Sequence, residues 1–112
     1  MKTSSQNNAG DEPGTLPATK LQELAALIAE QPSPVNIRDN KQRAALAAEA
    51  LWLFASRTGL AQDGETFENV LLDFMADMLH LCRQTGFITD ERDLLEGILR
   101  PAMVFCDMDS PQ

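Results

Sequence analysis

The sequence predicts an all-α fold, a compact irregular bundle of four to five helices. Apolar residues recur at helical spacing in four separate segments of the chain. Helix-capping residues stand before most of these segments, and glycine or proline follows them. With 112 residues, of which 44% are hydrophobic, the chain is long enough for one domain with a small core.

The two ends of the chain are expected to lie outside this domain. Residues 1–15 are rich in Ser, Asn, Gly, Pro and Asp and offer almost nothing to bury, so they predict a disordered N-terminal tail. Residues 16–107 form the single helical domain, and residues 108–112 are expected to fray.

The first helix is predicted within residues 17–31. Pro17 suits a first turn, where its missing N–H costs nothing, and Pro32 and Pro34 end the helix. One side of this helix is apolar and carries Leu21, Leu24, Ala25, Ile28 and, at its margin, Leu27.

The second helix, residues 40–58, is the most apolar. Either Asp39 or Asn40 can cap its start, and Gly59 suits the left-handed position after its end. Leucines, Phe54 and alanines cover more than half of its circumference, so it is expected to be packed on several sides at the centre of the fold. Trp52 lies beside the narrow polar strip of this helix. This position fits either a half-buried residue at the rim of the core or an anchor for a partner.

The third helix follows a turn at Gly64 and ends at Gly86, with Asp63 or Thr66 as its cap. Its two faces differ sharply in character. The apolar face carries Leu71, Phe74, Met75, Met78, Leu81 and Cys82. The polar face carries Asn69, Asp73, Asp77, His80, Arg83 and Gln84.

Asp73, Asp77 and His80 are the one set of residues whose spacing suggests metal ligands. Side chains three or four residues apart on a helix can touch, and a Glu-x-x-His pair binds iron in di-iron bundles. Those bundles, however, direct ligands inward from several helices, and this chain has a single histidine on a polar face. We therefore predict a solvated helix face, with no metal, cofactor or catalytic residue; a small metal-dependent enzyme using these three residues is the alternative.

The fourth helical segment begins after Thr89, which is the predicted cap, and has acidic residues in its first turn. Its apolar residues stay on one side even across Pro101, which favours a kinked helix; a break followed by a separate short helix is the alternative. That side carries Leu94, Leu95, Ile98, Leu99, Ala102, Phe105 and Cys106.

Charge is unevenly distributed along the chain. The net charge is −8, and between residues 59 and 99 nine acidic residues oppose only Arg83 and Arg92, a net −7. This sign disfavours nucleic acid as a partner. No apolar run is long enough to span a membrane, and the first residues lack the pattern of a signal peptide, so a cytoplasmic protein is expected. In a reducing compartment, Cys82 and Cys106 are expected to be small apolar residues of the core.

The stretch "LLDFMADMLHLCRQTGF" resembles a broad group of short, largely uncharacterised proteins carried by phages, plasmids and integrative elements. Their shared pattern is similar to "LLADLMHxxxxxGxDFD", and the likeness covers roughly a sixth of the chain. It rests on Leu71, Leu72, Asp73, Ala76, Asp77, Met78, Leu79, His80, Gly86 and Phe87. Beyond this stretch the group continues with an acidic helix ending in His-Tyr, whereas this chain runs "ITDERDLLEGILRPAMVF". The resemblance implies a helical fold and a mobile-element setting.

These observations favour a small, acidic, non-catalytic interaction protein, either an adaptor or an inhibitor, that acts on a protein with a basic surface. A DNA mimic, whose carboxylates imitate phosphate spacing, is a special case of this hypothesis, and a homodimer is compatible with it. The predicted partner-binding residues are Asp73, Asp77, His80, Asp90, Glu91, Asp93, Glu96 and Trp52.

Overall fold

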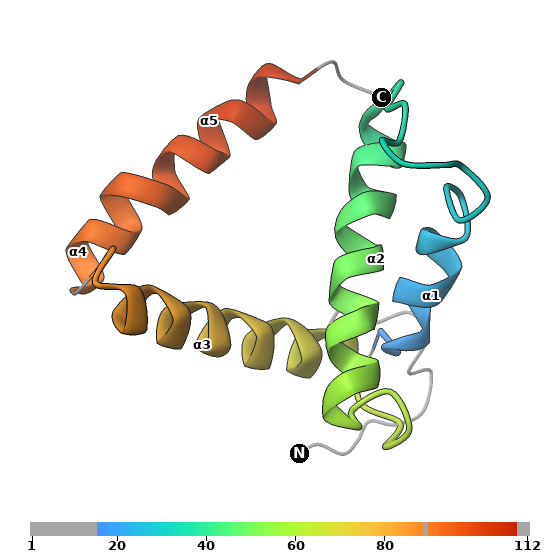
Figure 1. The fold of residues 1–112 in the computed structure, drawn as a ribbon, viewed down its shortest axis with the longest axis horizontal. Coiled ribbons are helices and arrows are strands. Elements are labelled where there is room, and N and C mark those ends of the chain that lie inside the picture. Colours follow the sequence, from blue (N-terminus) through green and yellow to red (C-terminus); the bar gives the residue numbers. More distant parts are fainter. Residues whose placement is uncertain (1–15, 89, 110–112) are drawn as a thin grey trace.

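The computed structural model describes residues 16–88 and 90–109, and their helices confirm the all-α prediction (Figure 1). Within these residues no strand is present, and the predicted tail at residues 1–15 lies outside them. The elements in order are α1 (Thr19–Ala25), α2 (Asn40–Thr58), α3 (Phe67–Thr85), α4 (Glu91–Leu94), the π-helical turn η4 (Leu95–Leu99) and α5 (Arg100–Met108).

The segment before α1 is bound to the start of α3. The Ala18 N–H donates to the Glu65 carbonyl at 3.0 Å, and the Phe67 N–H donates to the Leu16 carbonyl at 2.7 Å. Pro17 therefore pairs with Thr66 in an isolated β-bridge and does not open the helix, which begins two residues later at Thr19. The α-helix also ends earlier than predicted, at Ala25, and tighter i→i+3 turns continue to Gln31.

Helix α2 begins and ends where the sequence predicts. Asp39 is the N-cap, its Oδ1 accepting the Gln42 N–H at 2.8 Å, and Gly59 takes the left-handed conformation with φ +88°. The prediction that α2 is packed on several sides is wrong. Its buried residues all lie on one face, and on the opposite side Leu46 and Leu53 are 42% and 62% exposed. The reason is that α3 crosses the end of α2 and then leaves it (Figure 1).

The core lies between α1, α2 and the first turns of α3. Its three largest fully buried side chains are Leu21, Ile28 and Val70. Small residues of α2 let α1 approach closely, and the partly buried rings of Phe54 and Phe74 meet edge to face with centroids 5.2 Å apart. The main cluster contains Ala18, Leu21, Ala25, Ala48, Leu51, Ala55 and Val70.

The fourth segment is one continuous helical arm made of α4, η4 and α5. Thr89 lies outside the described residues, and Asp90 is the cap, its side chain accepting the Asp93 N–H at 2.9 Å. The helix continues through Pro101, but its hydrogen-bonding pattern changes just before the proline. The turn before it widens to a π-turn in which the Arg100 N–H donates to the Leu95 carbonyl, and this adjusts the backbone where the proline ring would crowd the Gly97 carbonyl.

Helices α2 and α3 and the arm form three sides of a triangle (Figure 1). The end of α5 returns toward the start of α2, where Arg43 Nε and Asp109 Oδ2 lie 3.7 Å apart. Both partners are substantially exposed, so this ion pair contributes little stability. The core fills the corner between α1, α2 and the first turns of α3, and the rest of α3 and the arm lie away from it.

Candidate functional site

The first part of the predicted site lies along α3. Thr66 accepts the Asn69 N–H at 3.2 Å, and Gly86 with φ +71° ends the helix, so both predicted boundaries are confirmed. Between them Asp73, Asp77 and His80 are all exposed. No side chain of the three makes a hydrogen bond or ion pair to another described residue, so these side chains are free to meet a partner.

The second part lies on the arm. Asp90, Glu91, Asp93 and Glu96 are also exposed. Glu96 forms a bidentate ion pair with Arg100, in which Nε of Arg100 donates to Oε1 of Glu96 at 2.8 Å and an Nη donates to Oε2 at 3.3 Å. Asp90 is engaged as the helix cap. Asp93 and Glu91 stand in the first turn, where the helix dipole favours negative charge.

The structure divides these acids into neighbouring groups. Asp90 and Glu91 share a shallow hollow with Arg83 and Arg92. Asp93 and Glu96 line a different hollow, beside Phe87, Ile88, Gly97 and Ile98. Arg83 and Arg92 therefore lie where α3 meets α4, next to Asp90 and Glu91. The acidic residues of α3 have no ion-pair partner among the described residues.

Most of the acidic charge in this half is uncompensated. Among the nine acidic residues between 59 and 99, Glu96 alone has an ion-pair partner in the described residues. Glu65 is half-buried and accepts a hydrogen bond from Asn69, and the other eight are exposed. A set of solvated carboxylates acts at a distance of about one Debye length, roughly 10 Å at 0.1 M salt.

The residues considered as metal ligands are exposed on the polar side of α3. Within residues 16–88 and 90–109, no group of three or more His, Cys, Asp and Glu side chains is arranged to hold a metal ion. Cys82 belongs to the other side of α3, where it lines an apolar groove, so it does not accompany His80. The expectation that both cysteines lie in the core is wrong, because Cys82 is only half-buried and Cys106 is exposed.

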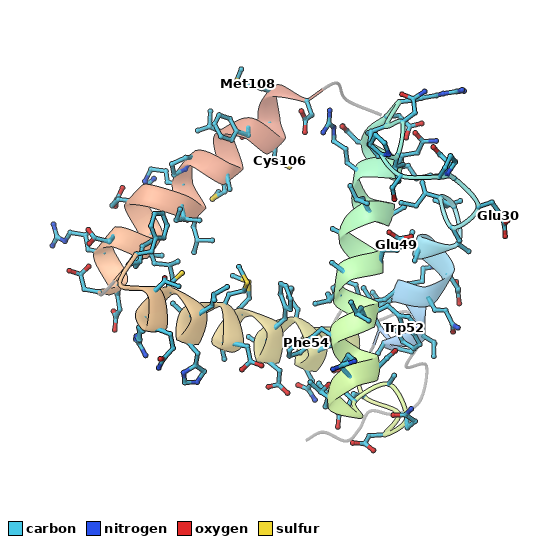
Figure 2. All side chains as sticks on the ribbon, viewed as in Figure 1. Glu30, Glu49, Trp52, Phe54, Cys106 and Met108 are labelled. Carbon is cyan, nitrogen blue, oxygen red and sulfur yellow. The ribbon has the colours of Figure 1, made fainter. Side chains whose placement is uncertain are left out.

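Trp52 is half-buried and packs against the core cluster of α1, α2 and α3 (Figure 2). This agrees with the interpretation of Trp52 as a rim of the core. Its role as a partner anchor stays a prediction. Leu72 of α3, 59% exposed, is a more accessible apolar residue close in sequence to the acids Asp73 and Asp77.

The sequence did not predict an apolar hollow that the structure shows beside α3. An apolar groove of about 440 Å³ lies in the corner between α3 and the arm. Thr85 is the single polar residue among those that line it, and none of them is charged. The lining residues are Phe74, Met75, Met78, Leu79, Leu81, Cys82, Thr85, Phe87, Leu94, Ile98 and Leu99.

The apolar surface continues along α5, where Met103, Val104, Phe105 and Met108 are each at least half exposed. Figure 2 shows Cys106 on the side of α5 that faces the inside of the triangle and Met108 on the outer side. The sequence carried a signal of this: "AMVFC" is apolar all around a helix, a pattern typical of a helix covered on every side.

No family model, curated protein or solved structure matches the chain. Among its described helices, none combines the length and the apolar character needed to cross a bilayer.

Proposed function

We propose that the chain is a non-catalytic interaction protein, an adaptor or inhibitor, whose acidic surface docks on a basic surface of another protein. The acidic surface is defined as Asp73, Asp77 and His80 of α3 together with Asp90, Glu91, Asp93 and Glu96 of the arm. The observation that carries the proposal is that these seven residues are all exposed and that only Glu96 is neutralised by an ion pair.

The charge distribution supports a use beyond solubility. Solubility requires a net charge but not its concentration in one half, whereas here residues 59–99 hold −7 and residues 16–58 hold +1. A one-sided field steers an oppositely charged partner into contact and raises the association rate more than the affinity. The structure also leaves the carboxylates of α3 solvated, so binding would not first have to break internal ion pairs.

Tight binding needs an apolar anchor beside the charges. Leu72 is better exposed for this role than Trp52, because Trp52 is half-buried against the core whereas Leu72 is 59% exposed. The proposal keeps the mobile-element setting that the "LLDFMADMLH" resemblance implies, and a cytoplasmic location, with which the two free thiols of Cys82 and Cys106 agree.

The test compares two variants that each lose four negative charges. The first variant is Asp73→Asn, Asp77→Asn, Asp90→Asn, Glu91→Gln; asparagine at position 90 preserves the helix cap. The control is Glu23→Gln, Glu30→Gln, Glu49→Gln, Asp107→Asn, four exposed acids outside the acidic surface.

A partner is first captured from the native host with the parent chain, and its association rate is then measured with all three proteins at several salt concentrations. We expect the first variant to associate about tenfold more slowly at 0.1 M salt, with the control near the parent, and the difference to vanish near 1 M. If both variants slow association equally, the acidic surface has no specific role in docking and serves only the solubility of the protein. A captured DNA-binding protein that loses its DNA on binding would identify the DNA-mimic form of the proposal.

A further inference from the structure

The apolar groove and its continuation on α5 form one uncovered face, here called the inner face. On α3 it includes Met78 and Leu81, 41% and 55% exposed. On the arm it includes Ile98 and Phe105, 38% and 67% exposed, which share a side of the helix at a spacing of seven. These are residues of the two apolar stripes that helical periodicity defines, and the core of α1 and α2 does not reach them.

The size of the inner face exceeds what a stable monomer normally leaves to water. At their exposed fractions, the large apolar side chains that line the groove, together with Phe105, present on the order of several hundred Å² of apolar surface. A monomer rarely exposes an apolar patch above a few hundred Å², whereas each partner in a standard interface buries about 800 Å². The face thus approaches the dimensions of one half of a stable interface.

The remaining residues of this chain are not suited to cover it. Outside the described residues lie 1–15, 89 and 110–112, and of these only Met1 and Ala9 are apolar. A charged partner is also a poor fit, because no charged residue lines the groove and a basic peptide would find no carboxylate within it. An occupant must itself present a long, uncharged apolar face of similar area.

We infer that a second copy of this chain covers the inner face, in a two-fold dimer in which α3 of each copy lies against α5 of its partner. A two-fold contact joins the same patch on both copies, so an uncharged apolar face is complementary to itself. Because α3 and the arm diverge from their shared corner, each leaves apolar residues uncovered, and the helices of a second copy can cover them. The carboxylates of α3 stand on the polar side of that helix and stay outside the contact.

The dimer has a salt dependence opposite to that of the acidic surface. Each chain carries −8, so the two copies repel one another, and salt that screens this repulsion strengthens their association. Docking of the acidic surface on a basic partner weakens with salt for the same reason. The two interactions are therefore separable in one titration, and failure of either leaves the other standing.

Sedimentation equilibrium of the full chain tests the inference with two charge-matched variants. Met78→Asp with Ile98→Asp places carboxylates in the groove, whereas Leu27→Asp with Leu72→Asp places them at exposed apolar positions outside the inner face. None of the four residues belongs to the core cluster, and circular dichroism with Trp52 fluorescence checks that each protein is folded.

We expect the parent and the control to sediment at twice the 12.3 kDa chain mass above about 10 μM. Their dimer dissociation constants should be lower at 1 M than at 0.1 M salt. The groove variant is expected to sediment at 12.3 kDa, with a dimer dissociation constant raised at least tenfold. A parent that stays monomeric at about 100 μM in high salt overturns the inference, as does a dimer that only the control variant disrupts.

A second measurement does not depend on disruptive variants. With Cys82→Ser, a nitroxide on Cys106 places one spin label in each chain. A two-fold dimer through the inner face gives a defined distance between the two labels that disappears on dilution with unlabelled chain. Absence of any dipolar coupling at a concentration where the mass is that of a dimer would place the contact elsewhere and overturn the inference.

Discussion

At the scale of single residues, two leucines that the sequence pattern does not distinguish differ strongly in their burial. Leu51 and Leu53 stand two positions apart in α2, both within the helix that the sequence predicts as the most apolar. Leu51 is 7% exposed because it faces α1, and Leu53 is 62% exposed because it points away from α1. Periodicity identifies an apolar arc, but which part of the arc meets another helix depends on where that helix lies.

Leu51→Ala and Leu53→Ala therefore form a matched pair. We expect Leu51→Ala to lower the free energy of unfolding by about 2–4 kcal/mol, since it leaves a cavity in the core. Leu53→Ala should change it by less than about 0.5 kcal/mol, because the residue is largely solvated and alanine is the better helix former. Urea unfolding of both proteins measures the difference, and equal losses would mean that both leucines are buried.

The residues Asp73, Asp77 and His80 carry a prediction about metal. We expect neither the parent nor the variant Asp73→Ala, Asp77→Ala, His80→Ala to bind zinc, manganese or magnesium with micromolar affinity, because three exposed groups on one helix provide no enclosed ligand set. Calorimetric titration checks this. Micromolar binding by the parent that the variant lacks would restore the metal-dependent enzyme as the better hypothesis.

At the scale of elements, the helix ends are what the sequence predicted best. Asp39, Thr66, Gly59 and Gly86 act as predicted because capping depends on residues within one turn of each other. The start of α1 was missed because Pro17 is held by the distant Thr66. At Pro101 the sequence favoured a continuous helix over a break, and the helix does continue; the π-turn that accommodates the proline ring was not predicted.

Two glycines provide a test at this scale. Gly86→Ala forces a side chain into the left-handed conformation at the end of α3, so we expect a loss of about 1 kcal/mol in stability. Gly97→Ala, within the arm, meets no atom within 4 Å and is expected to leave stability unchanged or raise it by up to about 1 kcal/mol. Thermal unfolding followed by circular dichroism compares the two variants. A larger loss of stability for Gly97→Ala than for Gly86→Ala would contradict the open space around Gly97 in the arm.

At the scale of the whole molecule, the sequence predicted the faces of the helices but not their partners. The apolar stripes of α3 and the arm were identified residue by residue, and they were expected within a compact bundle. The core is built by α1, α2 and the first turns of α3, and Met78, Leu81 and Phe105 of these stripes are exposed. Local spacing contains no information about which of several apolar faces pair within one chain, and that choice decides both the groove and the inferred dimer.

The measurement that tests this account most directly is amide hydrogen exchange at several protein concentrations. If the core of α1 and α2 is complete in one chain and the arm is covered by a second copy, protection of residues 40–58 should not depend on concentration. Protection of residues 91–108 should rise steeply as the dimer forms, because the arm packs little against its own core. Strong protection of the arm at the highest dilution, equal to that of α2, would show that one chain buries its own inner face and would contradict the account.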